Sequence, residues 1–275
     1  DLSKNHISSL KSLGYESLAG LRLRRLDLGH NLIAIPSAAG GPSDGDLLGR
    51  CVSLEELDLA DNFVDSVAPL SGLSRLRFLD LRTNRIADLS PISGLSSLEE
   101  LDLGENDVAD LSALAGLGKL AYLNLRANRR IASLEPLQDL TGLKTLIIRD
   151  VPAGADLSTL RKLKSLRRLN ARNCGISDTA VLGELMASGA LRDDPETGEE
   201  AEVNLLQNAL PAAGSDPYRP IRPYWGSISY RTPFALPWVP GKVPPPSFSR
   251  EGGFYGEPFE LGLVSSAPGA AIHYT

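Results

Sequence analysis

The sequence predicts an α/β solenoid, in which short coils of chain stack side by side and each coil adds one strand to a parallel sheet. Three observations lead to this fold class. A leucine pattern recurs through residues 1–210, its spacing is 22 residues three times in succession from Asn62 to Asn128, and little chain is left between successive copies for any long helix. A fixed internal period of this length is the signature of a repeat architecture.

The repeating unit has the form L-x-x-L-x-L-x-x-N-x-[L/I/V]. Copies start at Leu23, Leu54, Leu76, Leu98, Leu120, Leu143 and Leu166, and partial copies around Leu2 and Val203 bring the number to nine. Within L-x-L the period of two places both leucines on one face of a short strand. One such strand cannot bury that face alone, so successive strands are expected to stack at roughly 4.8 Å and to merge their leucines into one core.

A polar residue closes each strand and is expected to stitch the coils together as an asparagine ladder. A short amide can satisfy both the N–H and C=O groups that are stranded where the chain turns inward. Its loss should cost about 1–3 kcal/mol for the groups left unsatisfied. The ladder positions are Asn5, Asn31, Asn62, Asn84, Asn106, Asn128, Cys174 and Asn208. Val151 occupies the equivalent position in one copy and cannot form hydrogen bonds, so the coil over residues 143–160 is expected to be the most irregular.

The returning side of each coil is short. Segments such as 90–95 and 135–140 contain a proline and leave room for a single helical turn or a 3₁₀ piece. The longer gap between Cys174 and Asn208 predicts a helix over residues 179–188, with Asp178 as its cap and Gly189 as its stop. The convex side is therefore expected to be mostly 3₁₀.

These residues resemble the leucine-rich repeat family, and specifically its short 22-residue type. The stretch from Ile86 to Leu98, IADLSPISGLSSL, is similar to the repeat of bacterial internalins. The resemblance covers about residues 1–210. It implies a solenoid whose parallel sheet lines the concave face, and a non-catalytic module that binds a protein or peptide there.

The composition changes sharply near residue 210. Ten of the 19 prolines lie between Pro211 and Pro246, and 11 of the 15 aromatic residues follow position 210. We expect three parts: the solenoid over residues 1–210, a Pro/aromatic-rich linker or cap over 211–245, and a truncated β-sandwich module over 246–275. The middle part has too many prolines for a helix or an inner strand, and is expected to cover the open end of the solenoid or to form a stalk.

Residues 253–261 and 269–275 resemble the opening of a chitobiase C-terminal-type (Fn3-associated) module. This resemblance implies a bacterial protein that is secreted or held at the cell surface, and it keeps a second function open. In that alternative the chain is the accessory region of a larger enzyme, possibly a carbohydrate-active one. We expect the sequence to be a fragment in either case.

Several classes of function are disfavoured. No apolar stretch reaches the roughly 18 residues of a membrane span, and a net charge of −6 argues against nucleic-acid binding. The three histidines are far apart, and no H-E-x-x-H, C-x-x-C or phosphate-loop pattern occurs. Residues 41–45 match G-x-S-x-G but sit in a Gly/Pro-rich insertion without the required strand and helix. We therefore expect no enzyme activity, no metal site and no cofactor.

Function is expected on the concave face, at the positions between the leucines. Phe78 and Tyr122 are its aromatic anchors, with mainly acidic residues before them and basic residues after them, so we expect a charge-asymmetric protein or peptide partner of a monomeric module. The alternative is that these residues form an ordinary solvated face, because Leu-Asp-Leu is common in such repeats. The candidate binding residues are Asp27, Glu56, Asp58, Phe78, Asp80, Arg82, Glu100, Asp102, Tyr122, Asn124, Arg126, Arg149, Arg168 and Arg172.

Overall fold

The computed structural model describes residues 1–13, 22–36, 44–208, 217–231, 247–248 and 263–264. The chain divides into two compact units. The first comprises residues 1–210 with 217–232, and the second comprises residues 211–216 with 233–275. The first unit holds the repeats and every candidate binding residue.

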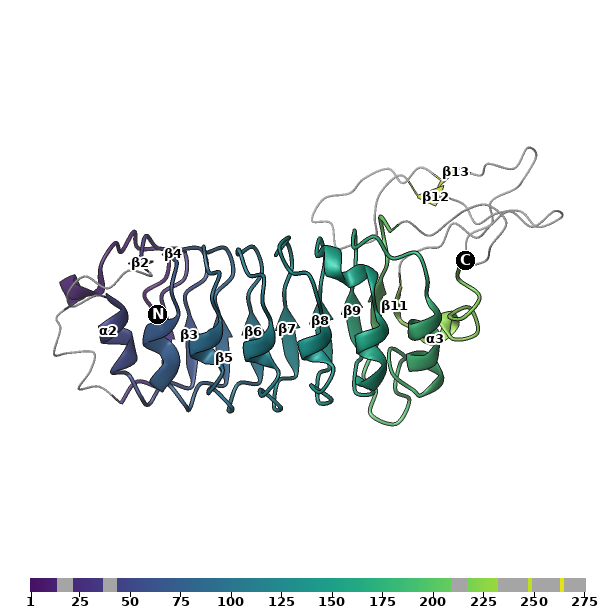
Figure 1. Cartoon of the computed structure of the whole chain (residues 1–275), viewed down its shortest axis with the longest axis horizontal. Helices are drawn as coiled ribbons and strands as arrows, with labels where there is room; N and C mark the ends of the chain where they lie inside the picture. The colour runs from purple at the N-terminus through teal and green to yellow at the C-terminus, as the bar shows by residue number, and fades with distance from the viewer. Residues whose placement is uncertain (14–21, 37–43, 209–216, 232–246, 249–262, 265–275) are drawn as a thin grey trace. The chain divides into compact units, whose positions relative to one another are not determined.

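A nine-stranded parallel sheet forms the first unit, and its strands follow one another in chain order (Figure 1). The strands are β1 (Arg25–Asp27), β3 (Glu56–Asp58), β5 (Phe78–Asp80), β6 (Glu100–Asp102), β7 (Tyr122–Asn124), β8 (Thr145–Ile147), β9 (Arg168–Asn170), β10 (Glu202–Asn204) and β11 (Tyr230–Arg231). Equivalent repeat positions pair across the sheet, as in Leu57 with Leu79 and Leu79 with Leu101. The predicted fold class, an α/β solenoid of leucine-rich repeats, is confirmed.

The two ends of the sheet differ from the sequence prediction. The first copy forms no strand. The backbone N–H of Leu2 nevertheless donates to the carbonyl of Asp27 at 2.9 Å and continues the backbone hydrogen bonding of the sheet. At the other end β11, which lacks the leucine pattern, adds a strand after β10. Ile221 and Ile228 are fully buried, so residues 217–232 belong to the solenoid unit and the expected division at residue 210 does not coincide with its end.

The convex side consists mainly of single 3₁₀ turns, as the short returning segments indicate. They are η1 (Leu10–Leu13), η2 (Ala68–Gly72), η3 (Ser90–Ile92), η4 (Ser112–Leu114), η5 (Glu135–Leu137), η6 (Pro152–Ala155), η7 (Ser158–Lys162) and, in the C-terminal cap, η8 (Trp225–Ser227). Two short α-helices, α2 (Asp44–Gly49) and α3 (Ala180–Ala187), occur in the longer copies. A carboxylate oxygen of Asp178 accepts the N–H of Ala180 at 2.8 Å at the start of α3. A small parallel pair, β2 (Ala34–Ile35) with β4 (Phe63–Val64), lies beside the first coils.

The ladder asparagines lie inside the coils and connect each coil to the one before it. The Asn106 amide donates to the carbonyls of Leu81 in the previous coil and Leu103 in its own, at 2.9 and 3.1 Å. Its oxygen accepts the N–H of Ile86 in the previous coil at 2.9 Å. Asn31, Asn62, Asn84 and Asn128 repeat this arrangement. The exposed first position, Asn5, instead donates its backbone N–H to the Asn31 side chain at 3.0 Å.

The ladder positions of Cys174 and Val151 use other chemistry, whereas Asn208 keeps the asparagine arrangement. The thiol of Cys174 donates to the carbonyl of Ile148 at 2.9 Å, the contact that an asparagine amide would make. Asn208 then accepts the backbone N–H groups of both Cys174 and Ile176 at 3.0 Å. At Val151, where no polar side chain is present, the chain turns through the additional 3₁₀ segment η6, and the N–H of Val151 donates to the carbonyl of Ile148. The same local bond occurs at Asn128, whose N–H donates to the carbonyl of Leu125 at 3.2 Å, so it does not take the place of a ladder side chain.

The second unit is described at four residues. β12 (Ser247–Phe248) pairs with β13 (Leu263–Val264) in antiparallel register. Most of the expected sandwich module at 246–275, the linker residues 232–246 and the glycine-rich segment 37–43 lie outside the described residues. In the described part of the chain, no helix combines the length and apolarity needed to cross a membrane.

Candidate functional site

Two parallel rows of side chains cross the sheet on the face opposite the leucine core. In each three-residue strand of the sheet the middle residue is buried, and the residues on either side of it point the other way. The first face row contains the residues before the middle one: Arg25, Glu56, Phe78, Glu100, Tyr122, Thr145, Arg168, Glu202 and Tyr230. The second face row contains the residues after it: Asp27, Asp58, Asp80, Asp102, Asn124, Ile147, Asn170 and Asn204.

The polar residues of the second face row all make the same local hydrogen bond. One side-chain oxygen accepts the backbone N–H two residues further on, which closes the end of the strand as an Asx turn. For Asp58 and Asp102 the partners are Ala60 at 2.8 Å and Gly104 at 2.9 Å. Asn124, in the later half of the row, binds the N–H of Arg126 at 2.9 Å in the same way. The turn needs an oxygen acceptor, and the structure supplies it with either a carboxylate or an amide.

Two carboxylates of the second face row, those of Asp58 and Asp80, are partly or fully removed from solvent. Asp80 is 5% exposed, and burial raises its pKa from 3.8 to about 7, with a smaller upward contribution from Asp102 and Asp58 that works against the Arg82 N–H and charge. Burial also raises the pKa of Asp58, and Asp27 adds to that effect. One cation lies close to Asp80: Nη1 of Arg82 is 3.4 Å from its carboxylate.

Phe78 and Tyr122 lie in the first face row, on strands that flank β6. Phe78 is in register with Glu100, and Glu100 is in register with Tyr122, so the order across the sheet is aromatic, acid, aromatic. Both rings are half-buried, whereas Glu100 is exposed. Burial raises the pKa of the Tyr122 hydroxyl to about 12, and the charges of Asp102 and Asp80 add to this. The Tyr122 side chain is therefore within electrostatic reach of the second face row.

Two arginines of the later coils form ion pairs within the chain, and a third is hydrogen-bonded to a neutral side chain. Arg126 lies 3.1 Å from Glu105, and Arg149 lies 3.2 Å from Asp150. Arg172 donates to the side-chain oxygen of Gln207 at 2.9 Å. In the early coils, Glu56 forms an ion pair with Arg25. The remaining uncompensated charge of the face is mainly negative, which the sequence pattern alone did not show. Arg168 is exposed in β9.

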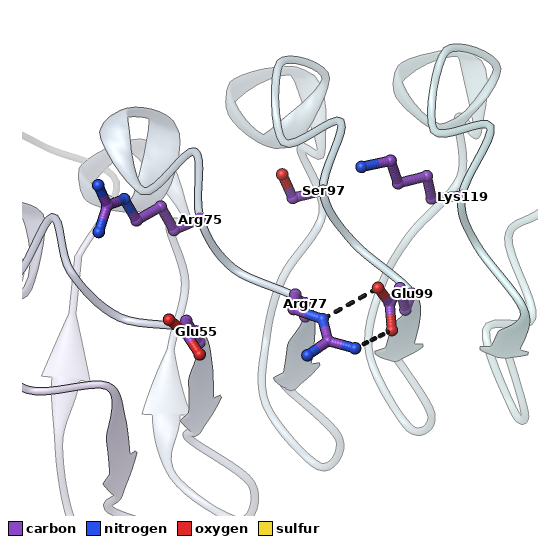
Figure 2. Close-up of a pocket in the computed structure, with 6 residues that line it drawn as sticks. All are labelled: Glu55, Arg75, Arg77, Ser97, Glu99 and Lys119. Atoms are coloured by element: carbon purple, nitrogen blue, oxygen red, sulfur yellow. Dashed lines mark hydrogen bonds and ion pairs between the residues drawn. The ribbon is translucent and has the colours of Figure 1, made fainter.

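A polar hollow of about 390 Å³ lies on the flank, beside the residues that precede the strands (Figure 2). Glu55, Arg75, Arg77, Ser97, Glu99 and Lys119 line it. Arg77 bridges to Glu99 through two hydrogen bonds of 2.9 and 2.7 Å, as the dashed lines in Figure 2 show. This flank lies outside the positions predicted from the sequence, although the alternation of basic and acidic residues at Arg24, Glu55, Arg77 and Glu99 in successive copies indicates ion pairs between coils.

The described residues contain no group of three or more His, Cys, Asp or Glu side chains placed to hold a metal ion. Cys51 and Cys174 are free and buried. Burial raises the pKa of the Cys174 thiol to about 11, which keeps it in the unreactive thiol form.

Comparisons with known proteins agree with this architecture. Residues 52–94 and 74–116 match the family "Leucine Rich repeats (2 copies)". The fold is similar to that of an internalin (inlF) from Listeria monocytogenes str. 4b F2365, with a TM-score of 0.56 and 24% identity over 79% of this chain and 62% of that one. It is also similar to internalin C2 (inlC2) of the same strain, with a TM-score of 0.60 and 24% identity over 80% of this chain and 91% of that one.

No curated protein matches the sequence. The chain spans 62% of the length of the inlF structure. The repeat match and the two similar structures support a leucine-rich-repeat protein with an internalin-like solenoid. The likenesses at 24% identity concern the fold, so function has to be argued from the face itself.

Proposed function

We propose that the chain is a non-catalytic binding module whose sheet face, opposite the leucine core, receives a protein or peptide. The observation that carries this proposal is the placement of Phe78 and Tyr122. Two half-buried aromatic rings stand in one row of a rigid sheet and are surrounded by charged residues. Aromatic anchors within a polar surround are typical of binding hot spots.

The fold supports the same proposal. A stack of coils offers a long rigid surface, on which each strand contributes two side chains at fixed spacing. Such a surface suits a macromolecular partner better than a small molecule, which prefers an enclosed and mostly apolar pocket. The distribution of compensated charge refines the expected partner. Because Arg126 and Arg149 are paired within the chain, the partner needs to be complementary mainly to the acidic early coils.

The proposal can be tested without knowing the natural partner. A random peptide library is displayed and selected on the immobilised full chain, and the affinities of the selected peptides are measured by calorimetry. Phe78→Ala with Tyr122→Ala should weaken binding about tenfold or more, because truncated anchors commonly cost over 1 kcal/mol each. Phe63→Ala is the matched control: Phe63 is 39% exposed and belongs to β4 in the small separate pair.

A selection that yields only peptides insensitive to the double substitution would contradict the proposal. So would peptides that lose affinity equally on Phe63→Ala. Thermal unfolding of each variant separates a lost contact from a lost fold.

We propose as the second candidate that the chain is the accessory region of a larger secreted or cell-surface enzyme. The antiparallel pair β12–β13 lies within residues 246–275, whose sequence resembles the start of a chitobiase C-terminal-type module. The sequence of the complete gene tests this candidate directly. A catalytic domain encoded beyond Thr275 would support it, whereas further repeats of the module or a surface anchor would favour a purely adhesive protein.

A further inference from the structure

Three adjacent strands place an acid between two aromatic residues. Phe78 of β5, Glu100 of β6 and Tyr122 of β7 are direct register partners in the first face row. Neighbouring strands are about 4.8 Å apart, so a group seated over Glu100 lies about 5 Å from the strand on either side. A cation is attracted to an aromatic face within about 6 Å of the ring centroid. One position over β6 is therefore within reach of both rings and the carboxylate.

Glu100 is available for a partner. Its side chain is exposed, and within the described residues no hydrogen bond or ion pair engages its carboxylate. The neighbouring glutamate of the same row, Glu56, is already paired with Arg25. The charges that face this position from the adjacent row are the carboxylates of Asp80 and Asp102 and the guanidinium of Arg82. Arg82 is engaged with Asp80 at 3.4 Å, so the negative field at this position comes from Glu100 and Asp102.

We propose that Phe78, Glu100 and Tyr122 form a cation clamp that holds one basic side chain of the partner, with arginine preferred over lysine. The clamp rests on the proposed binding function of this face and specifies the chemistry of its partner. A guanidinium is planar and weakly hydrated, so it can stack against an aromatic ring on each side while it donates to a carboxylate below it. A neutral or acidic side chain gains neither the ring contacts nor the ion pair.

Glu202 provides a matched comparison within the same row. It occupies the equivalent position in β10, but its register partners are Arg168 and Tyr230. A guanidinium placed over Glu202 would therefore meet a like charge on one side instead of a second ring. The clamp is specific to the β5–β7 region because the aromatic residues flank an acid on both sides there.

The clamp can be tested on the full chain with N-acetyl-arginine amide as the probe. Its dissociation constant is obtained from the backbone amide NMR shifts of Leu79, Leu101 and Leu123 in a titration. N-acetyl-citrulline amide, which has the same shape without the charge, should bind about tenfold more weakly. Glu100→Gln should weaken arginine binding by about the same factor, whereas Glu202→Gln should leave it unchanged. Phe78→Leu and Tyr122→Leu should each weaken it several-fold.

Three results would overturn the clamp: no saturable shift with the arginine probe, equal binding of the arginine and citrulline probes, or equal losses for Glu100→Gln and Glu202→Gln. The last result would indicate general attraction to an acidic surface. Failure of the clamp is distinguishable from failure of the proposed function. Peptides selected on the protein could still depend on Phe78 and Tyr122 while containing no required arginine, and the binding face would then stand without the clamp.

Discussion

The early and late halves of the second face row perform the same structural task with different charge. Asp27, Asp58, Asp80 and Asp102 close their strands with a carboxylate oxygen. Asn124, Asn170 and Asn204 close theirs with an amide oxygen. The hydrogen bonds are 2.8–3.0 Å in the first group and 2.9–3.3 Å in the second. The Asx turn explains why each of these positions carries a side-chain oxygen. It does not explain why four consecutive coils carry a carboxylate there.

Folding disfavours the charged forms of Asp58 and Asp80 in the early half. Burial and neighbouring carboxylates raise the pKa of Asp80 to about 7, which means that the folded protein disfavours the charged form. An amide would make the turn without that cost, as the late half demonstrates. The proposed binding role would account for the acidic character of the early half, whereas the solvated-face alternative leaves unexplained why a buried carboxylate stands where an amide would suffice.

The asparagine ladder should be equally important in both halves, and its removal should have the largest effect. Asn106→Ala in the acidic half and Asn128→Ala in the amide half each leave buried backbone groups without partners. Each substitution should lower the free energy of unfolding by about 3 kcal/mol, the upper end of the expected range, because more than one backbone group loses its partner. Urea unfolding followed by circular dichroism measures both losses. A much smaller loss for one variant would mean that the two halves differ in their backbone scaffold and not only in charge.

Asp80→Asn should stabilise the protein at alkaline pH. Because the folded-state pKa is about 7 and the ordinary value is 3.8, the folded chain holds the proton more tightly than the unfolded chain between these values. Stability is therefore lost as the pH rises through this window, and the loss is complete above pH 7. The amide variant should gain about 1–3 kcal/mol at high pH and nothing below the ordinary pKa. Urea unfolding across this pH range checks the result.

The reverse substitution is the control for this pH dependence. Asn124→Asp adds a carboxylate beside Asp102 and removes the amide hydrogen bond of 3.0 Å to that residue. It should destabilise the protein by about 1 kcal/mol at alkaline pH. Equal stability of Asp80→Asn and the natural protein at every pH would show that the carboxylate is adequately compensated by Arg82.

Backbone strain at the residue before each ladder position offers another comparison of the early and late halves, with a smaller expected effect on stability. The residue before each ladder position is in the left-handed region, with φ of 54° at Thr83 in the early half and 53° at Asn173 in the late half. A β-branched residue tolerates this conformation poorly, whereas asparagine tolerates it well. Thr83→Asn should raise the free energy of unfolding by about 0.5–1 kcal/mol, measured by urea unfolding. Thr83→Ala, which is still strained but unbranched, should gain less, and an equal or larger gain for alanine would contradict the explanation.

Much of the fold could be predicted from the sequence because one repeating pattern determines it. The 22-residue spacing places Leu79, Leu101 and Leu123 in register, and their alternation with polar residues assigns the two faces. Strand β11 was missed because Tyr230–Arg231 joins the sheet through its backbone and through burial of Ile221 and Ile228, without a leucine motif.

The sequence predicted which positions belong to the candidate site, but not how their side chains interact. Sequence assigned Phe78, Tyr122 and the acidic residues to one face, but the compensation of Arg126 by Glu105 depends on side-chain geometry. The burial of Asp80 likewise depends on what packs around it in three dimensions. The Asx turns at Asp58 and Asp102 were missed although a short acid two residues before a turn N–H is a recognisable local signal.

The most direct test of the central claim measures stability and binding in one variant. Asp58→Asn and Asp80→Asn are combined, so that the two turns of the early half whose carboxylates have raised pKa values acquire the amide chemistry of the late half. We predict that the free energy of unfolding at alkaline pH increases while the affinity for peptides selected on the natural protein falls about tenfold. Unchanged affinity together with increased stability would contradict the account, because the carboxylates would then destabilise the folded protein without contributing to binding.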